Sequence, residues 1–279
     1  MLSFLLAIIA AAAAAYYTWT AGEGEHWGWA ILACFGAALV VLIPINLIVR
    51  KKLNAIFMGV QNSLMESQKR LQLKANTLVQ RGQGTPKLAA KLEEELAEDI
   101  KKAMIPLEGV RKYNLWNPLA SRQADMLKAQ LYYQIKDYDS ARPLMEKAFV
   151  VDPSFLCMKL ILQWKKAPED IAALEKIFRK NISRFKYEKG KLAYATYSWL
   201  LVKQEKLTEA VTLLAEAKKQ TEDPVIAQNW EHLANNRVKR FSNAGLGEQW
   251  YALGLEQPAA ARPVMQDRFG GRPRGGFRR

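Results

Sequence analysis

Residues 27–52 read WGWAILACFGAALVVLIPINLIVRKK, and this stretch decides how the rest of the chain is organised. It carries no charge from Trp27 to Val49, and about 23 residues at ~1.5 Å per residue span a ~30 Å hydrocarbon core. Arg50, Lys51 and Lys52 follow at once. Because basic residues stay on the cytoplasmic side, the stretch predicts a transmembrane helix that ends in the cytoplasm.

An earlier apolar run extends from Leu2 to Tyr17, and the polar segment AGEGEH (21–26) separates the two runs. Together they predict a transmembrane helical hairpin over residues 1–50, in a two-pass protein of the bacterial inner (plasma) membrane. The alternative is a signal peptide cleaved after the small residues 11–15. The large carboxyl-terminal part is cytoplasmic under either interpretation. Aromatic rings flank the hairpin, as they do at a bilayer interface: Tyr16, Tyr17, Trp19, Trp27 and Trp29.

The charge is unevenly distributed along the 279 residues. Residues 1–49 contain only two charged side chains, Glu23 and Glu25, and the net surplus of +14 gathers mainly in residues 50–81 and 258–279. An amino-terminal segment with so few charges excludes a purely soluble protein. With two cysteines the chain is not a disulfide-framework domain, and its nearly balanced middle disfavours a broad nucleic-acid face.

Residues 51–118 are expected to form a helical stalk and a linker. A helix should continue from the membrane to about residue 80, RGQGTP (81–86) should break it, and residues 87–104 should form a second helix. The acidic run within 93–99 is expected to be a solvated face. Residues 105–118, which include Pro106 and Gly109, are expected to be the linker. The apolar stripe of the stalk consists of Leu53, Ile56, Phe57, Val60, Leu64, Leu71 and Leu78.

From about residue 119 the sequence predicts helices of 12–18 residues with short breaks, and this regular spacing prompts a search for repeats. The breaks are KDYD (136–139), DPS (152–154), KAPED (166–170), QEK (204–206) and TEDP (221–224). Residues 122–155 carry small and aromatic residues at the spacing of one repeat: Ala129, Tyr132, Tyr138, Ala141, Ala148 and Pro153.

This segment resembles the tetratricopeptide repeat (TPR) family. Residues 191–224 match it again, with Ala210 and Ala217 seven apart, like Ala141 and Ala148. Asp152–Pro153 is expected to stop the second helix of the first pair. We therefore expect an all-α fold, in which the membrane hairpin precedes a cytoplasmic α-α superhelix of TPR-like helix pairs over 119–257.

The resemblance implies a concave groove, lined by the first helix of each pair, that binds a protein segment. Position by position, this groove would present Gln123, Met126, Gln130, Tyr133, Gln134, Leu192, Ala195, Trp199, Val202, Lys203, Gln228, Glu231, Asn235 and Lys239. The notable members are Tyr133 and Trp199, because aromatic side chains often anchor partners. The opposing interpretation is that both are core residues.

Residues 258–279 are rich in Pro, Gly and Arg, a composition that cannot bury a core, so a disordered basic tail is expected. Its arginines, which include Arg272, Arg274, Arg278 and Arg279, suit contact with anionic lipid. They also suit RNA.

Catalytic and metal-binding motifs are missing from the sequence, and no cofactor is expected. The chain has no C-x-x-C, H-E-x-x-H, Walker or nucleophile-elbow pattern. We therefore expect a non-enzymatic scaffold or adaptor at the cytoplasmic face of the membrane, which binds a protein partner through its groove. The alternative is a membrane tether for RNA or ribosomes, which would act through the basic stalk and tail.

Overall fold

The computed structural model describes residues 2–21, 27–81 and 86–258, and the elements in these ranges are helical, without a strand among them. The predicted all-α class is confirmed. The chain divides into two compact units, residues 1–183 and 184–279. This boundary falls inside the range 119–257 that was predicted to be one TPR-like domain.

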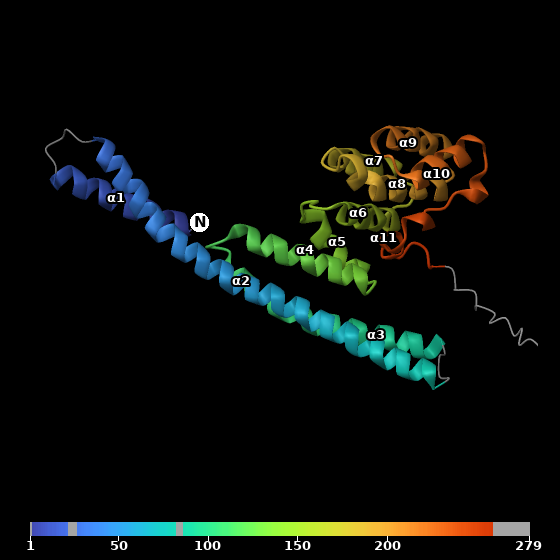
Figure 1. Cartoon of the computed structure of the whole chain (residues 1–279), viewed down its shortest axis with the longest axis horizontal. Helices are drawn as coiled ribbons and strands as arrows, with labels where there is room; N and C mark the ends of the chain where they lie inside the picture. The colour runs from blue at the N-terminus through green and yellow to red at the C-terminus, as the bar shows by residue number, and fades with distance from the viewer. Residues whose placement is uncertain (1, 22–26, 82–85, 259–279) are drawn as a thin grey trace, which may run out of the picture. The chain divides into compact units, whose positions relative to one another are not determined.

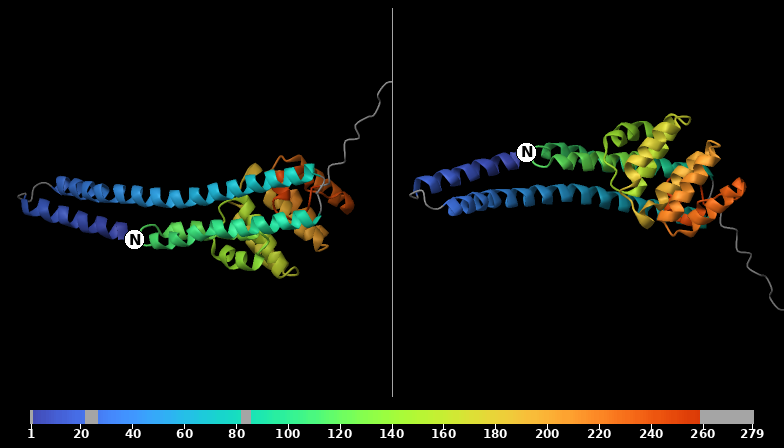
Figure 2. Two further views of the ribbon diagram at one scale, coloured as in Figure 1. Left: turned by 90° about the horizontal axis from the view of Figure 1, so that it is seen from below. Right: turned by 90° about the horizontal axis from the view of Figure 1, so that it is seen from above.

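The first two helices pack along each other. Helix α1 (Leu2–Ala21) lies beside the amino-terminal part of α2 (Trp27–Gln80), as Figures 1 and 2 show. The thiol of Cys34 donates a hydrogen bond to the carbonyl oxygen of Ala11 at 3.3 Å. Helix α2 is unbroken for 54 residues and passes through Pro44. The predicted continuation of the apolar helix into a stalk is therefore confirmed.

A hydrophobic core joins the stalk to the helix after it. Helix α3 (Pro86–Met104) runs alongside α2 (Figure 1), and the 3-10 helix η1 (Ile105–Tyr113) and α4 (Pro118–Gln134) pack on them. The prediction of a linker at 105–118 was wrong for its first part, because Leu107 and Val110 are fully buried. The shared core consists of Leu53, Val60, Ile100, Met104, Leu107, Val110, Ala120, Ala124 and Leu131.

The remaining helices begin and end near the predicted breaks. The first unit continues with α5 (Tyr138–Lys147), α6 (Pro153–Lys166) and α7 (Ile171–Ile182). The second unit contains η2 (Tyr187–Gly190), α8 (Lys191–Lys203), α9 (Leu207–Gln220), α10 (Pro224–Ala234), η3 (Val238–Arg240), η4 (Ala244–Leu246) and α11 (Glu248–Tyr251). Helix α11 is only a single turn.

Asp152 and Pro153 start a helix rather than stop one, which corrects the expected role of this pair. Helix α5 already ends at Lys147, and Ala148 is its carboxyl-terminal cap. Oδ1 of Asp152 accepts the backbone N–H of Phe155 at 2.7 Å, and proline at the first helical position has no N–H to leave unpaired. The same Asx–Pro start recurs at α4 and α10.

One tight turn recurs after α4, α8 and α10. Lys136, Glu205 and Asn236 each adopt a left-handed conformation, with φ of 62°, 60° and 56°. In each case the backbone N–H of the next residue donates a hydrogen bond to the carbonyl oxygen five residues earlier, as in a Schellman motif. These bonds are Asp137 to Tyr132 (2.9 Å), Lys206 to Leu201 (2.9 Å) and Arg237 to His232 (2.7 Å). The turns at Lys136 and Glu205 are 69 residues apart, like Ala141 and Ala210, and both alanines are fully buried.

Candidate protein-binding surfaces

In the first unit, the residues expected to line a groove lie on α4 and differ in exposure. Gln123 and Gln134 are exposed, whereas Met126 and Gln130 are half-buried. Tyr133 is only 5% exposed, its ring meets that of Tyr138 edge-on at 5.5 Å, and burial raises its pKa. Tyr133 therefore packs between α4 and α5 instead of presenting its face to a partner.

In the second unit, Leu192, Ala195 and Trp199 on α8 are buried. The remaining expected groove residues there are accessible in whole or in part: Val202, Lys203, Gln228, Glu231, Asn235 and Lys239. Lys239 lies on η3, outside α10. The accessible groove positions are therefore mostly polar, with Met126 and Val202 as the apolar ones, and both aromatic residues are packed inside the protein.

The chain's own carboxyl-terminal segment covers Trp199. The indole N–H of Trp199 donates to Oε1 of Glu256 at 2.7 Å, and that of Trp250 donates to Oε2 at 2.8 Å. The two indole rings meet at 6.2 Å, and Nζ of Lys203 lies 4.9 Å from the Trp199 ring. A groove position inferred from the sequence is thus filled from within the same chain.

Two buried asparagines tie the NAGLG turn (243–247) to α8, and sequence reasoning missed both. Asn229 donates to Oδ1 of Asn243 at 2.8 Å, and Asn243 donates to the carbonyl oxygen of Ala195 at 3.0 Å. Asn229 also accepts the backbone N–H of Ser242 at 3.0 Å. Both amides are buried, and a buried amide requires hydrogen-bond partners, which these contacts supply.

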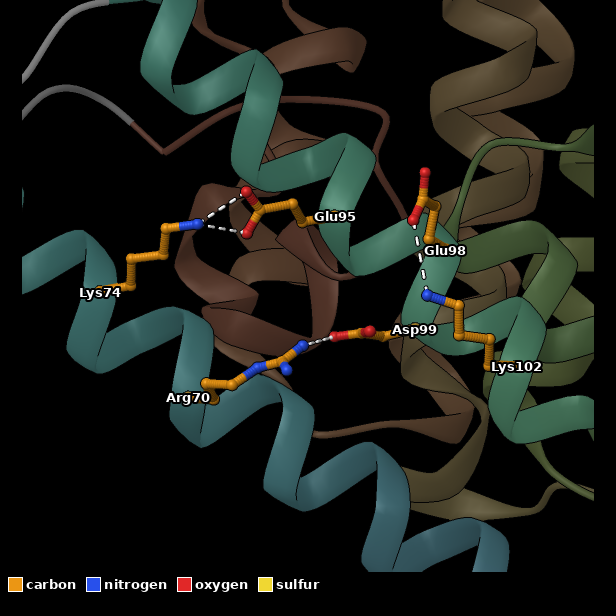
Figure 3. Close-up of polar contacts among 6 residues, drawn as sticks. All are labelled: Arg70, Lys74, Glu95, Glu98, Asp99 and Lys102. Atoms are coloured by element: carbon orange, nitrogen blue, oxygen red, sulfur yellow. Dashed lines mark hydrogen bonds and ion pairs between the residues drawn. The ribbon is translucent and has the colours of Figure 1, made fainter.

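The acidic run of α3 is largely exposed, as expected, and several of its carboxylates also form ion pairs. Figure 3 shows Asp99 facing Arg70 and Glu95 facing Lys74 across the α2–α3 interface. The Lys74 ammonium is 2.7 Å from Oε1 and 2.6 Å from Oε2 of Glu95, and this hydrogen bonding lowers the pKa of the carboxyl group. A further pair joins Glu93 to Lys136 at 2.8 Å. The run therefore aligns α3 with α2 and with the turn after α4.

The apolar half of α2 is exposed in the structure. Residues 31–80 form the one described helix that is long and apolar enough to cross a membrane, and its most apolar stretch is not buried against the protein. Arg50, Lys51 and Lys52 are exposed at the end of this stretch. The tail arginines 272, 274, 278 and 279 lie outside the described residues.

No cluster of three or more His, Cys, Asp or Glu side chains that could hold a metal ion occurs within 2–21, 27–81 and 86–258. No protein-family model, no curated protein and no solved structure matches this chain. The resemblance to the TPR family therefore rests on the residues and spacings of the sequence itself.

Proposed function

We propose that the protein is a membrane-anchored helical adaptor that binds a protein partner at the cytoplasmic face of the bacterial inner membrane. The observation that carries this proposal is the continuity of α2. Its amino-terminal half exposes apolar side chains that need lipid around them, whereas Leu53 and Val60 in its other half belong to a packed core. The anchor and the stalk are thus one rigid element.

The orientation follows from the charges beside the apolar stretch. Arg50, Lys51 and Lys52 keep the carboxyl end of the span in the cytoplasm, and α1 supplies the other arm of a two-pass hairpin. A reporter that works only in the cytoplasm should therefore be active when it is fused after Arg279, and a reporter that works only in the periplasm should be inactive there. Activity of the periplasmic reporter at this position would contradict the proposed orientation.

We assign partner binding to the accessible groove positions, and each of the two units is considered as a separate surface. In the first unit these are Gln123, Met126, Gln130 and Gln134, and in the second they are Val202, Lys203, Gln228, Glu231, Asn235 and Lys239. A surface of amides and charges with little exposed apolar area suits a polar, salt-sensitive interface.

Site-specific photocrosslinking in cells tests this assignment. A photoreactive amino acid at Gln134 or Gln228 should give one discrete protein adduct. The same residue at Glu146 on α5 or Thr212 on α9, which are equally exposed but lie on the second helices, should give none. Adducts from all four positions, or from none, contradict binding through the first helices.

The same crosslinking experiment, repeated with the tail deleted, distinguishes the adaptor from the RNA tether. Deletion of residues 258–279 should leave the protein adduct intact, since the proposed surfaces lie elsewhere. Loss of the adduct on tail deletion, together with recovery of RNA from ultraviolet-crosslinked wild-type protein, replaces the adaptor proposal with the tether.

A further inference from the structure

A polar cavity lies between α2 and the start of α4 in the first unit. It has a volume of about 470 Å³. The α2 side contributes one stripe of side chains, because positions 46, 50, 54 and 57 are spaced by three or four residues. The full lining is Asn46, Val49, Arg50, Leu53, Asn54, Phe57, Asn117 and Gln123.

The chemistry of this lining favours an anion. Arg50 is its single charged residue, and no carboxylate lies among the lining residues. Asn54, Asn117 and Gln123 supply further N–H donors, and so does Asn46, whose amide also donates to the carbonyl oxygen of Leu42 at 2.9 Å. A guanidinium donates several hydrogen bonds in a planar fork, which matches phosphate oxygens. Val49, Leu53 and Phe57 form an apolar wall beside these donors. A ligand with a phosphate next to hydrocarbon satisfies both halves of the cavity.

Asn117 is already oriented by its own chain. Its Oδ1 accepts the backbone N–H of Leu119 at 3.1 Å and so caps α4. This leaves the amide N–H₂ of Asn117 as the group that a ligand oxygen can use. The amino-terminal end of α4, with its partial positive charge, begins at the same residue and adds to the attraction for an anion.

The position of the cavity along α2 identifies the source of the phosphate. Asn46 lies in the last turn of the apolar stretch, and Arg50 is the first charged residue after it. In a helix that spans the bilayer, these residues lie at the depth of the cytoplasmic lipid headgroups. We propose that the cavity binds the phosphate of an anionic phospholipid headgroup. This inference rests on the proposed membrane anchor.

Native mass spectrometry of the full-length protein in detergent, titrated with phosphatidylglycerol, measures the binding directly. Arg50→Gln should weaken lipid binding at least about tenfold, as expected for the loss of charge-assisted hydrogen bonds. Lys52→Gln removes the same charge two residues further along α2, outside the cavity lining, and should change binding less than about twofold. Gln123→Leu should weaken binding, whereas Gln68→Leu, at an exposed position of α2 outside the cavity lining, should not.

Equal losses of phosphatidylglycerol binding in Arg50→Gln and Lys52→Gln overturn the proposal, because they indicate a general attraction of the lipid to positive surface charge. Equal binding of phosphatidylcholine, whose choline cancels the phosphate charge, also overturns it. Sodium phosphate alone should compete weakly, since it lacks the apolar part. If sodium phosphate competes strongly with the lipid and Arg50→Gln abolishes this competition, the cavity is an anion site for free phosphate and not for a lipid headgroup.

Carbonate extraction of membranes separates this inference from the proposed function. If the wild-type protein is released by carbonate, the anchor itself fails. If it stays in the membrane while Arg50→Gln binds lipid as well as wild type, only the cavity proposal fails.

Discussion

The indole N–H of Trp199 donates a 2.7 Å hydrogen bond to Oε1 of Glu256, a residue 57 positions later in the chain. The second oxygen of the same carboxylate accepts the indole N–H of Trp250 at 2.8 Å. A single side chain thus joins α8 to the segment that follows α11. Since Trp250 is completely buried and Trp199 is 6% exposed, both donors depend on this acceptor in place of water.

Removing the carboxylate should therefore destabilise the second unit. Glu256→Ala should lower the free energy of unfolding by about 2–4 kcal/mol, because two buried donors lose a charged acceptor. Glu256→Gln should have a smaller effect, since the amide keeps one acceptor oxygen. Urea unfolding of the full-length protein in detergent, followed by tryptophan fluorescence, measures both values. The control is Glu248→Ala, an exposed residue of α11, and a Glu256→Ala variant as stable as this control contradicts the prediction.

Overpacking at the two equivalent alanines tests the helix-pair register. Ala141→Leu and Ala210→Leu should each lower the free energy of unfolding by about 1–3 kcal/mol, because neither site has room for extra methyl groups. Ala234→Leu, at an exposed position of α10, should be neutral. Unfolding by urea compares the three variants. The register is wrong if either buried alanine tolerates leucine as well as residue 234 does.

The Lys74–Glu95 pair should stabilise the stalk in a pH-dependent way. Folding lowers the pKa of Glu95 below its ordinary value of 4.5, chiefly through the hydrogen bond from Lys74. The carboxylate therefore contributes stability above pH 4.5, and this contribution disappears as the pH falls through the lower, folded-state pKa. A double-mutant cycle with Lys74→Met and Glu95→Gln should show coupling at pH 7 that is lost at strongly acidic pH. Equal coupling at both pH values would argue against an ionic interaction.

Asp223 combines two roles that substitution can separate. It accepts the backbone N–H of Val225 at 2.9 Å as the cap of α10, and its Oδ2 lies 3.1 Å from the Lys191 ammonium. Asp223→Ala removes both interactions and should cost about 1–2 kcal/mol for the cap alone. Asp223→Asn keeps a good cap, so its remaining effect measures the ion pair. Thermal unfolding at neutral pH gives the comparison, and equal losses in the two variants would mean that the cap contributes nothing.

The same ion pair predicts a change at high pH. The hydrogen bond from Lys191 to Asp223 is the main cause that raises the pKa of the lysine above 10.5. The ammonium therefore contributes stability that is complete below pH 10.5 and is lost as the pH rises through the folded-state pKa. The stability difference between wild type and Asp223→Asn should shrink over that range. A constant difference from pH 8 to pH 12 would contradict this.

The features that the sequence predicted well depend on local chemistry. Helical periodicity and the polar breaks placed the helices, because neighbours within four residues decide both. The run from Trp27 to Val49 likewise predicted, from its own composition, a helix that is long and apolar enough to cross a membrane. Asp152–Pro153 was misread because a proline that ends one helix and a proline that begins the next look alike without the cap geometry.

The features that were missed depend on residues far apart in the chain. Trp199 matched a groove position, but Glu256 decides its environment from 57 residues away. The acidic run of α3 looked like a solvated face because its partners are separated by 21 to 43 residues. Periodicity reports which face of a helix is apolar but not which distant charge meets the polar face.

Because α2 is unbroken, the face of its apolar part that meets α1 has a fixed rotation about the helix axis relative to the face that meets α3 further along. One residue inserted near Arg50 turns everything on one side of it by about 100° relative to the other. The face that meets α1 would then no longer match the face that meets α3. Four inserted residues would nearly restore the phase at the cost of ~6 Å of added length. Natural variation in this segment should therefore tolerate insertions of whole turns better than insertions of single residues.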